Sequence, residues 1–387
     1  MKRMYLLMGV AVTLVALLVV GCAGGGGGGG ERQTITLDFG TFWPAVDFQV
    51  SLGHKEWAKA ISDRVIATTT NWTIAWNWYY SGSPAALRTG VLASPATYDV
   101  ITTGPGYYAG VYPLFDGPSQ PANITRKNAL QMSMAAQKLW ETFTPLSADF
   151  AAKEPNIKVM HWWDTGPGMF LMVLGHNITL KADFTGERIR AADMGSNATI
   201  TALGAIGCYM PMSAALLAFQ GGTIDGILCP TDTPKGFGLS AYVRSCTYAP
   251  FCYQFVFAKW MSKSTWDSLP VDVQAVFNEV NAKYAEYYGK LRTWGEFNGL
   301  LYCRSLLGWN VSWWEYNPAV SSPADYDTWI SACYPSLLNN WEGGNQTRID
   351  LWGNFTALMD YYLNTDPWKS WTTDGLDANP PPVPTFP

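Results

Sequence analysis

Two arginines, Arg188 and Arg190, occupy alternate positions of a short segment with strand character. Alternate residues of a strand point to the same face, so both side chains lie opposite Ile189. A guanidinium presents a planar fork of donors that matches a carboxylate, and it also forms structural ion pairs. We expect one of these arginines to lie at the strand end and project into a cleft, while a structural ion pair remains the alternative.

Aromatic residues follow several of the predicted strands. Trp43 lies in the first strand-to-helix loop, Tyr107 follows the third strand, and Trp163 ends the first strand of a second unit. Because ligands of α/β sheets bind beyond the carboxyl ends of strands, we expect a cleft lined by these residues, with Asp232 as a polar contact. Such side chains suit a ring or an apolar acid as well as a sugar. For each tryptophan taken singly, ordinary core packing is the alternative.

The sequence lacks the motifs of the common enzyme classes. It has no GxSxG elbow, no HExxH, no Walker-type loop and no GxGxxG between a strand and a helix, and its three histidines stand in unrelated contexts. We therefore expect no catalytic residues, no metal site and no cofactor. Isolated pairs of acidic residues are the one route to catalysis that the sequence leaves open.

Six cysteines follow Cys22 in a chain that contains seven. In an oxidising compartment an even number permits disulfides, and spacing alone leaves their connectivity open. The pairs that we would test first are Cys246 with Cys252 and Cys303 with Cys333. None of the six stands in a CxxC pair, which disfavours a zinc or redox site.

Residues 1–22 have the form of a bacterial export signal. A basic start precedes an apolar run that ends at Cys22, and this run is shorter than the ~20 residues of a membrane span. Its last four residues, Val19-Val20-Gly21-Cys22, resemble a lipobox, which implies that Cys22 becomes the lipidated first residue. Residues 23–33, rich in glycine, are predicted to be a flexible tether. The sequence thus predicts an extracytoplasmic, lipid-anchored protein, on the periplasmic side in a cell with two membranes; an ordinary signal peptide is the alternative.

The charge balance is acidic. The chain carries 25 Lys and Arg against 30 Asp and Glu, a formal net charge of −5, and it has no run of basic residues. Such a chain is a poor partner for nucleic acid. An anionic ligand must therefore be bound by a few focused positive groups.

Strands and helices alternate from residue 34 onward, which predicts an α/β protein with parallel sheets. The pattern restarts after a helical stretch near residues 129–142, and a long helix is expected over residues 270–297. We predict two domains. Their expected extents are residues 34–157 plus about 222–262 for the first, residues 158–221 plus about 263–365 for the second with the C-terminal helices, and residues 366–387 for a proline-rich tail.

An ordered series of motifs surrounds the two arginines. Asp183-Phe184-Thr185-Gly186-Glu187-Arg188-Ile189-Arg190 is followed by Leu203-Gly204-Ala205 and by Ala218-Phe219-Gln220-Gly221-Gly222-Thr223-Ile224-Asp225-Gly226. Tyr98-Asp99-Val100 upstream and Trp266-x-x-Leu269-Pro270 downstream extend the series. In residue type, order and spacing, the chain from about residue 34 to about residue 295 resembles the extracytoplasmic solute-binding proteins of TRAP transporters, the DctP-like family.

This resemblance implies a two-domain, periplasmic-binding-protein-like fold with a ligand cleft between the domains and C-terminal helices. By position, Arg190 matches the arginine that in this family pairs with a ligand carboxylate, whereas Arg188 falls at a solvated position. The resemblance also implies capture of an organic acid by closure of the cleft, with hinge candidates at Ile224–Pro230 and Tyr248–Phe257, and delivery to integral membrane subunits of a TRAP-type permease.

The chain departs from the family pattern near the expected ligand. Ala214 and Leu216 stand where the family has a glutamate and a tyrosine, and Ile227 to Cys229 replace polar residues. These changes disfavour a small, highly hydroxylated acid. An ABC-type solute-binding lipoprotein and a surface glycan-binding or adhesion lipoprotein remain as alternatives.

Overall fold

The computed structural model describes residues 31–80, 82–117, 128–173, 175–305, 326–365 and 380–386. The predicted signal, Cys22, most of the tether and residues 366–379 of the predicted tail lie outside these ranges. Within them, no helix combines the length and the apolar character that crossing a membrane requires. Residues 380–386 run beside α1 (Lys55–Thr68) and α9 (Val271–Ser305), where Lys283 Nζ donates to the carbonyl of Thr385 at 2.6 Å.

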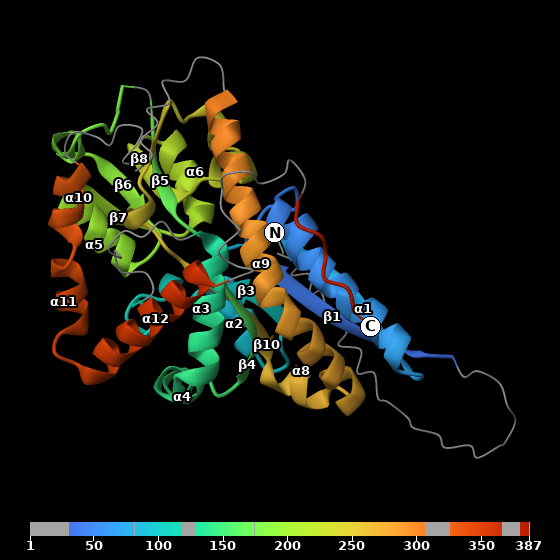
Figure 1. Cartoon of the computed structure of the whole chain (residues 1–387). Coiled ribbons are helices and arrows are strands. Elements are labelled where there is room, and N and C mark those ends of the chain that lie inside the picture. Colours follow the sequence, from blue (N-terminus) through green and yellow to red (C-terminus); the bar gives the residue numbers. More distant parts are fainter. Residues whose placement is uncertain are drawn as a thin grey trace, which may run out of the picture.

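The fold consists of two lobes, each built on a mixed five-stranded sheet and covered by helices (Figure 1). In the first lobe, β1 runs parallel to β2 and β3, and β10 is antiparallel to β3 and β4. The order of this sheet is β2 (Trp72–Tyr80), β1 (Gln33–Thr41), β3 (Val100–Thr103), β10 (Val256–Ser262) and β4 (Ile157–Asp164).

In the second lobe, β6 runs parallel to β7 and β8, and β5 is antiparallel to β8 and β9. The order of this sheet is β7 (Ile206–Tyr209), β6 (Arg188–Ala191), β8 (Gly226–Pro230), β5 (Gly168–Met172) and β9 (Ser245–Tyr248). The α/β class is as predicted, but neither sheet is purely parallel. The chain reaches β5 and β10 by crossing from the other lobe. Each of these strands therefore starts at the end of its sheet that faces the other lobe, and it runs antiparallel to its neighbours.

The chain crosses between the lobes at residues 165–167 and 249–255, so three strands lie in the other lobe from the one predicted. Residues 158–164 belong to β4 in the first sheet, whereas β8 and β9 both belong to the second sheet. The segment Tyr248–Phe257 contains a crossing, whereas Ile224–Pro230 does not. Alternating hydrophobicity locates strands, but their sheet depends on pairing partners such as β4 and β10, which are about a hundred residues apart.

Helices hold the two lobes together. The long helix α9 packs against α1, α3 (Ala129–Thr142) and β4 in the first lobe and continues alongside α7 (Thr233–Gly236) in the second. At the opposite side, α10 (Tyr326–Cys333) packs against α5 (Met194–Leu203), and α12 (Gln346–Asn364) returns to α3. The core of the first lobe is rich in aromatic residues, among them the fully buried Trp57, Trp162 and Trp260.

The six described cysteines are all in the free thiol form. The predicted pairs are not adjacent: Cys246 on β9 lies in hydrogen-bonding contact with Cys303 on α9, and this contact, followed by burial, raises the pKa of the Cys246 thiol. Burial, with a smaller effect of Cys333, raises the pKa of Cys252. Spacing along the chain could not reveal these neighbours, because α9 and α10 return to the second lobe from distant parts of the sequence.

Candidate functional site

A small cavity lies between the two lobes, at the carboxyl ends of the parallel strands. Its volume is about 30 Å³. The first lobe contributes Phe42, Trp43, Tyr107 and Phe257 to its walls. The second lobe contributes Arg190, Met212, Cys229, Pro230, Asp232, Thr233 and Phe237. Thr165 and Tyr253 from the crossing segments and Arg292 from α9 complete it.

Arg190 is the central charged group of this cavity. It lies on β6 between β7 and β8, and only 1% of it is exposed. Its Nε donates to the carbonyl of Met210 at 2.9 Å, and its Nη1 donates to the carbonyl of Leu228 at 3.1 Å. Its Nη2 has no hydrogen-bond partner among the described residues. The strand pairing thus holds a buried cation that is bonded to two neutral carbonyls and interacts with the side chain of Tyr107.

Arg188, two residues earlier on the same strand, is engaged differently. Its Nε and Nη2 donate to the two carboxylate oxygens of Asp225 at 2.8 and 2.6 Å. The Arg188 side chain is 42% exposed, and the bond to Arg188 lowers the pKa of Asp225. Of the two arginines, Arg188 therefore forms the structural ion pair and Arg190 faces the cavity.

The aromatic wall comes from the loops after β1 and β3 and from β10. Trp43 stacks on Phe42 with ring centroids 3.9 Å apart, and Tyr107 meets Phe42 edge-on at 5.5 Å. Phe257 lies 4.8 Å from Trp43. Burial raises the pKa of Tyr107, and Arg190 acts in the opposite direction. Beside a buried cation, this wall suits an anion with a flat or apolar body.

Trp163 lies one layer behind this wall and is not among the lining residues. It is fully buried, stacks on Phe257 at 4.8 Å and on Tyr288 at 5.2 Å, and its ring centroid is 5.7 Å from that of Trp43. Its position supports the rings that line the cavity.

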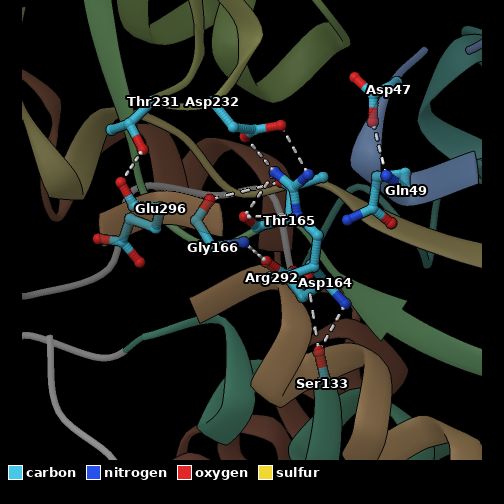
Figure 2. Close-up of polar contacts among 10 residues, drawn as sticks. All are labelled: Asp47, Gln49, Ser133, Asp164, Thr165, Gly166, Thr231, Asp232, Arg292 and Glu296. Carbon is cyan, nitrogen blue, oxygen red and sulfur yellow. Dashed lines mark hydrogen bonds and ion pairs between the residues drawn. The ribbon is translucent and has the colours of Figure 1, made fainter. Parts of the chain in front are cut away.

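Asp232 lines the cavity and is bound to an arginine that sequence analysis did not single out. The guanidinium of Arg292 donates from Nη1 and Nη2 to the two oxygens of Asp232 at 2.9 and 2.7 Å (Figure 2). Its Nη2 also donates to the carbonyl of Thr165 at 3.2 Å. Arg292 lies on α9, four residues after the buried Tyr288 and therefore on the same buried face. A charged residue on the buried face of an amphipathic helix was the signal that could have identified it in the sequence.

Two further buried carboxyl groups stand near this pair. Burial, followed by repulsion from Asp232, raises the pKa of Asp47 to about 7. Its Oδ1 accepts from the amide of Gln49 at 2.7 Å, and its Oδ2 has no hydrogen-bond partner among the described residues. Burial also raises the pKa of Asp164, to about 8. Sequence analysis missed both residues, because an isolated Asp in a loop, such as Asp47, or at the end of a strand, such as Asp164, is an ordinary turn residue.

The described residues contain one group that approaches metal-ligand geometry, formed by His176, Glu187 and Asp225. It lies apart from the cavity lining. Its carboxylates are already engaged, since Asp225 binds Arg188 and Glu187 accepts a hydrogen bond from His176 Nδ1 at 2.8 Å. This group is therefore a partly buried network of hydrogen bonds around the Arg188–Asp225 ion pair.

Solved structures of TRAP solute-binding proteins share this fold. A protein from a marine metagenome, specific for aromatic acid ligands and crystallised with 3-hydroxybenzoate, has a TM-score of 0.72 and 19% identity over 86% of this chain and 99% of its own. A protein from Rhodoferax ferrireducens with copurified benzoate has a TM-score of 0.68 and 21% identity over 84% of this chain and 98% of its own. A Bordetella bronchiseptica protein with bound mandelate has a TM-score of 0.71 and 17% identity over 84% of this chain and 99% of its own.

The family model described as bacterial extracellular solute-binding protein, family 7 (DctP), matches residues 85–302, which is more than half of the chain. The matched residues include β3 through most of α9, and hence the strand that carries Arg190 and the helix that carries Arg292. This chain belongs to the DctP family of bacterial extracellular solute-binding proteins.

Proposed function

We propose that this chain captures a small organic acid in the cavity between its lobes and delivers it to the integral membrane subunits of a TRAP-type transporter. Arg190 carries the proposal. Its buried guanidinium is bonded to two carbonyls and forms no ion pair with a described residue. An unpaired buried charge is costly, and a ligand carboxylate would supply the missing negative charge together with acceptors for Nη2.

The walls favour an acid with an aromatic or apolar body. Trp43 and Tyr107 would contact that body, Trp163 would hold the rings of the wall in place, and Asp232 would act as a polar contact through its pair with Arg292. The relatives with bound benzoate, mandelate and 3-hydroxybenzoate bind acids of this kind.

The mechanism would be closure of the two lobes around the ligand. Both lobes line the cavity, so a bound acid contacts both and stabilises the closed arrangement, which the membrane subunits would recognise. The protein would bind its ligand without converting it. A lipid on Cys22 and the glycine-rich tether, which spans ~5–6 Å × √n for n residues, would keep the domain beside these subunits.

Calorimetric titration of the full chain in mild detergent, with aliphatic, aromatic, keto and sugar acids, tests the proposal. Arg190→Ala should weaken binding of the best acid by about 30-fold or more, because truncating one partner of a buried charge pair costs ~2–5 kcal/mol. Arg190→Lys should recover only part of this loss, since lysine lacks the planar fork. Arg188→Ala is the matched control on the same strand. Normal binding of an acid by Arg190→Ala, or binding of glycans alone, would contradict the proposal.

A further inference from the structure

Two guanidiniums line the cavity, and they differ in how their charge is compensated. Arg190 and Arg292 are both 1% exposed. Arg190 is bonded to two carbonyls and interacts with the neutral Tyr107 side chain, and its Nη2 has no hydrogen-bond partner among the described residues. Arg292 faces the carboxylate of Asp232, which is itself 7% exposed. Only one of these two cations is therefore open to an anionic ligand.

The donors of Arg292 are also nearly all in use. Besides the two bonds to Asp232, its Nη2 and Nε donate to the carbonyl of Thr165 at 3.2 and 3.4 Å. These bonds engage four of the five N–H groups of the guanidinium. A ligand carboxylate could bind Arg292 in a bidentate manner only by displacing Asp232, which would then be a buried carboxylate without its partner.

The surroundings of this ion pair are acidic. Asp47, from the first lobe, is 1% exposed and close enough to Asp232 to repel it electrostatically. Its carboxyl group packs against α7, where a Cβ on Gly236 would lie 2.0 Å from Asp47 Oδ2. A second negative charge in the cavity would meet Asp232 and Asp47. Arg190 and Arg292 are the only cationic residues among those described that line the cavity, so no further cation balances this charge, and such like-charge contacts are strongly unfavourable.

We propose, on the basis of the proposed function, that this cavity selects monocarboxylates whose remaining part is uncharged and rejects dicarboxylates. Arg190 binds the single carboxylate. The pair of Asp232 with Arg292 provides a wall that is polar but already neutralised. Asp232 is thus a specificity-determining residue, because it pairs with Arg292, the cation that a second carboxylate would need.

Two matched pairs of acids test this selection: benzoate against benzene-1,3-dicarboxylate, and butyrate against succinate. Dissociation constants are measured by calorimetry with the full chain at pH 7.5, where both carboxyl groups of each diacid are ionised. Within each pair that gives measurable binding, we expect the diacid to bind at least tenfold more weakly than the monoacid.

The variant Asp232→Asn frees the charge of Arg292 while preserving the shape of the side chain. It should reduce the preference for the monoacid by tenfold or more. Asp225→Asn is the matched control, because it breaks a carboxylate–guanidinium pair of the same geometry outside the cavity, and it should leave the preference unchanged. If Asp232→Asn does not fold, the comparison of the acids on the unaltered protein decides.

The outcomes separate this inference from the proposed function. A diacid that binds the unaltered protein as tightly as its monoacid, and that loses binding in Arg190→Ala, overturns the selection and leaves the proposed function standing. A preference that Asp232→Asn and Asp225→Asn change equally also overturns the role of Asp232. If no acid of any class binds, both the selection and the proposed function are wrong.

Discussion

The hydroxyl of Tyr209, at the end of β7 in the second lobe, donates a hydrogen bond of 2.6 Å to the backbone carbonyl of Tyr107 in the first lobe. Tyr107 is also a cavity-lining residue. The bond therefore joins the two lobes directly at the edge of the cavity. A separation of the lobes would break it.

Removing this hydroxyl should destabilise the closed form. The net contribution of one hydrogen bond is ~0.5–1.5 kcal/mol, so Tyr209→Phe should weaken acid binding by about 2- to 10-fold, chiefly through faster dissociation. Stopped-flow measurement of ligand release checks this. Tyr242→Phe is a suitable control, because the Tyr242 hydroxyl accepts from Gln220 within the second lobe. Equal dissociation rates for the two variants would argue against a role in closure.

Asp47 should make the stability of the protein depend on pH. Its pKa is about 7 in the fold, whereas an unfolded aspartate titrates near ~3.9. As the pH rises, Asp47 loses its proton in the unfolded chain before it does so in the fold. Its contribution to the free energy of unfolding is therefore fully present below about pH 4 and declines until about pH 7. The decline is at most ~1.4 kcal/mol per pH unit. Asp47→Asn removes this decline and should gain stability relative to the unaltered protein between pH 5 and pH 8, as measured by urea unfolding.

Asp225→Asn provides the contrast for that experiment. Arg188 lowers the pKa of Asp225, so the carboxylate is ionised in the folded and unfolded states at both pH values. Its replacement should cost the same stability at pH 5 as at pH 8. If the difference between Asp47→Asn and the unaltered protein is also the same at both pH values, Asp47 does not titrate as described.

Gly236 should be sensitive to the addition of a single methyl group. A Cβ there would lie 2.0 Å from Asp47 Oδ2 across the two lobes. Overpacking costs ~1–3 kcal/mol, so Gly236→Ala should hinder closure and weaken acid binding by about tenfold. Gly353→Ala on α12 is the control, because a Cβ there meets nothing within 4 Å. Calorimetry with the best acid decides, and unaltered binding by Gly236→Ala would show that the two lobes do not need this contact.

Local patterns in the sequence predicted the elements well and their assembly only in part. The helix expected over residues 129–142 is α3, and the helix expected over residues 270–297 corresponds to α9, which continues to Ser305. Both have strong periodicity and clear capping or turn residues. The sheets to which β4, β8 and β9 belong were predicted wrongly, because strand pairing joins distant residues, about a hundred positions apart for β4 and β10, and leaves no local signal.

Part of the cavity lining was predictable from the rule that ligands of α/β sheets bind beyond the carboxyl ends of strands. Trp43, Tyr107, Arg190 and Asp232 follow or end strands, and the structure brings all four to one cavity. Trp163 also ends a strand, yet its side chain points into the packing behind the wall. Arg292 was missed because its partner Asp232 lies 60 residues earlier in the chain, and only the tertiary fold brings them together.

The most direct test of the central claim is a crystal structure of the protein with its tightest-binding monocarboxylate. We expect the carboxylate to accept a hydrogen bond from Arg190 Nη2 at ~2.7–2.9 Å, the usual distance for a charged pair. The body of the ligand should lie against Trp43 and Tyr107, and the pair of Asp232 with Arg292 should remain intact. A carboxylate bound to Arg292, or one that leaves Arg190 without an anionic partner, would contradict the account.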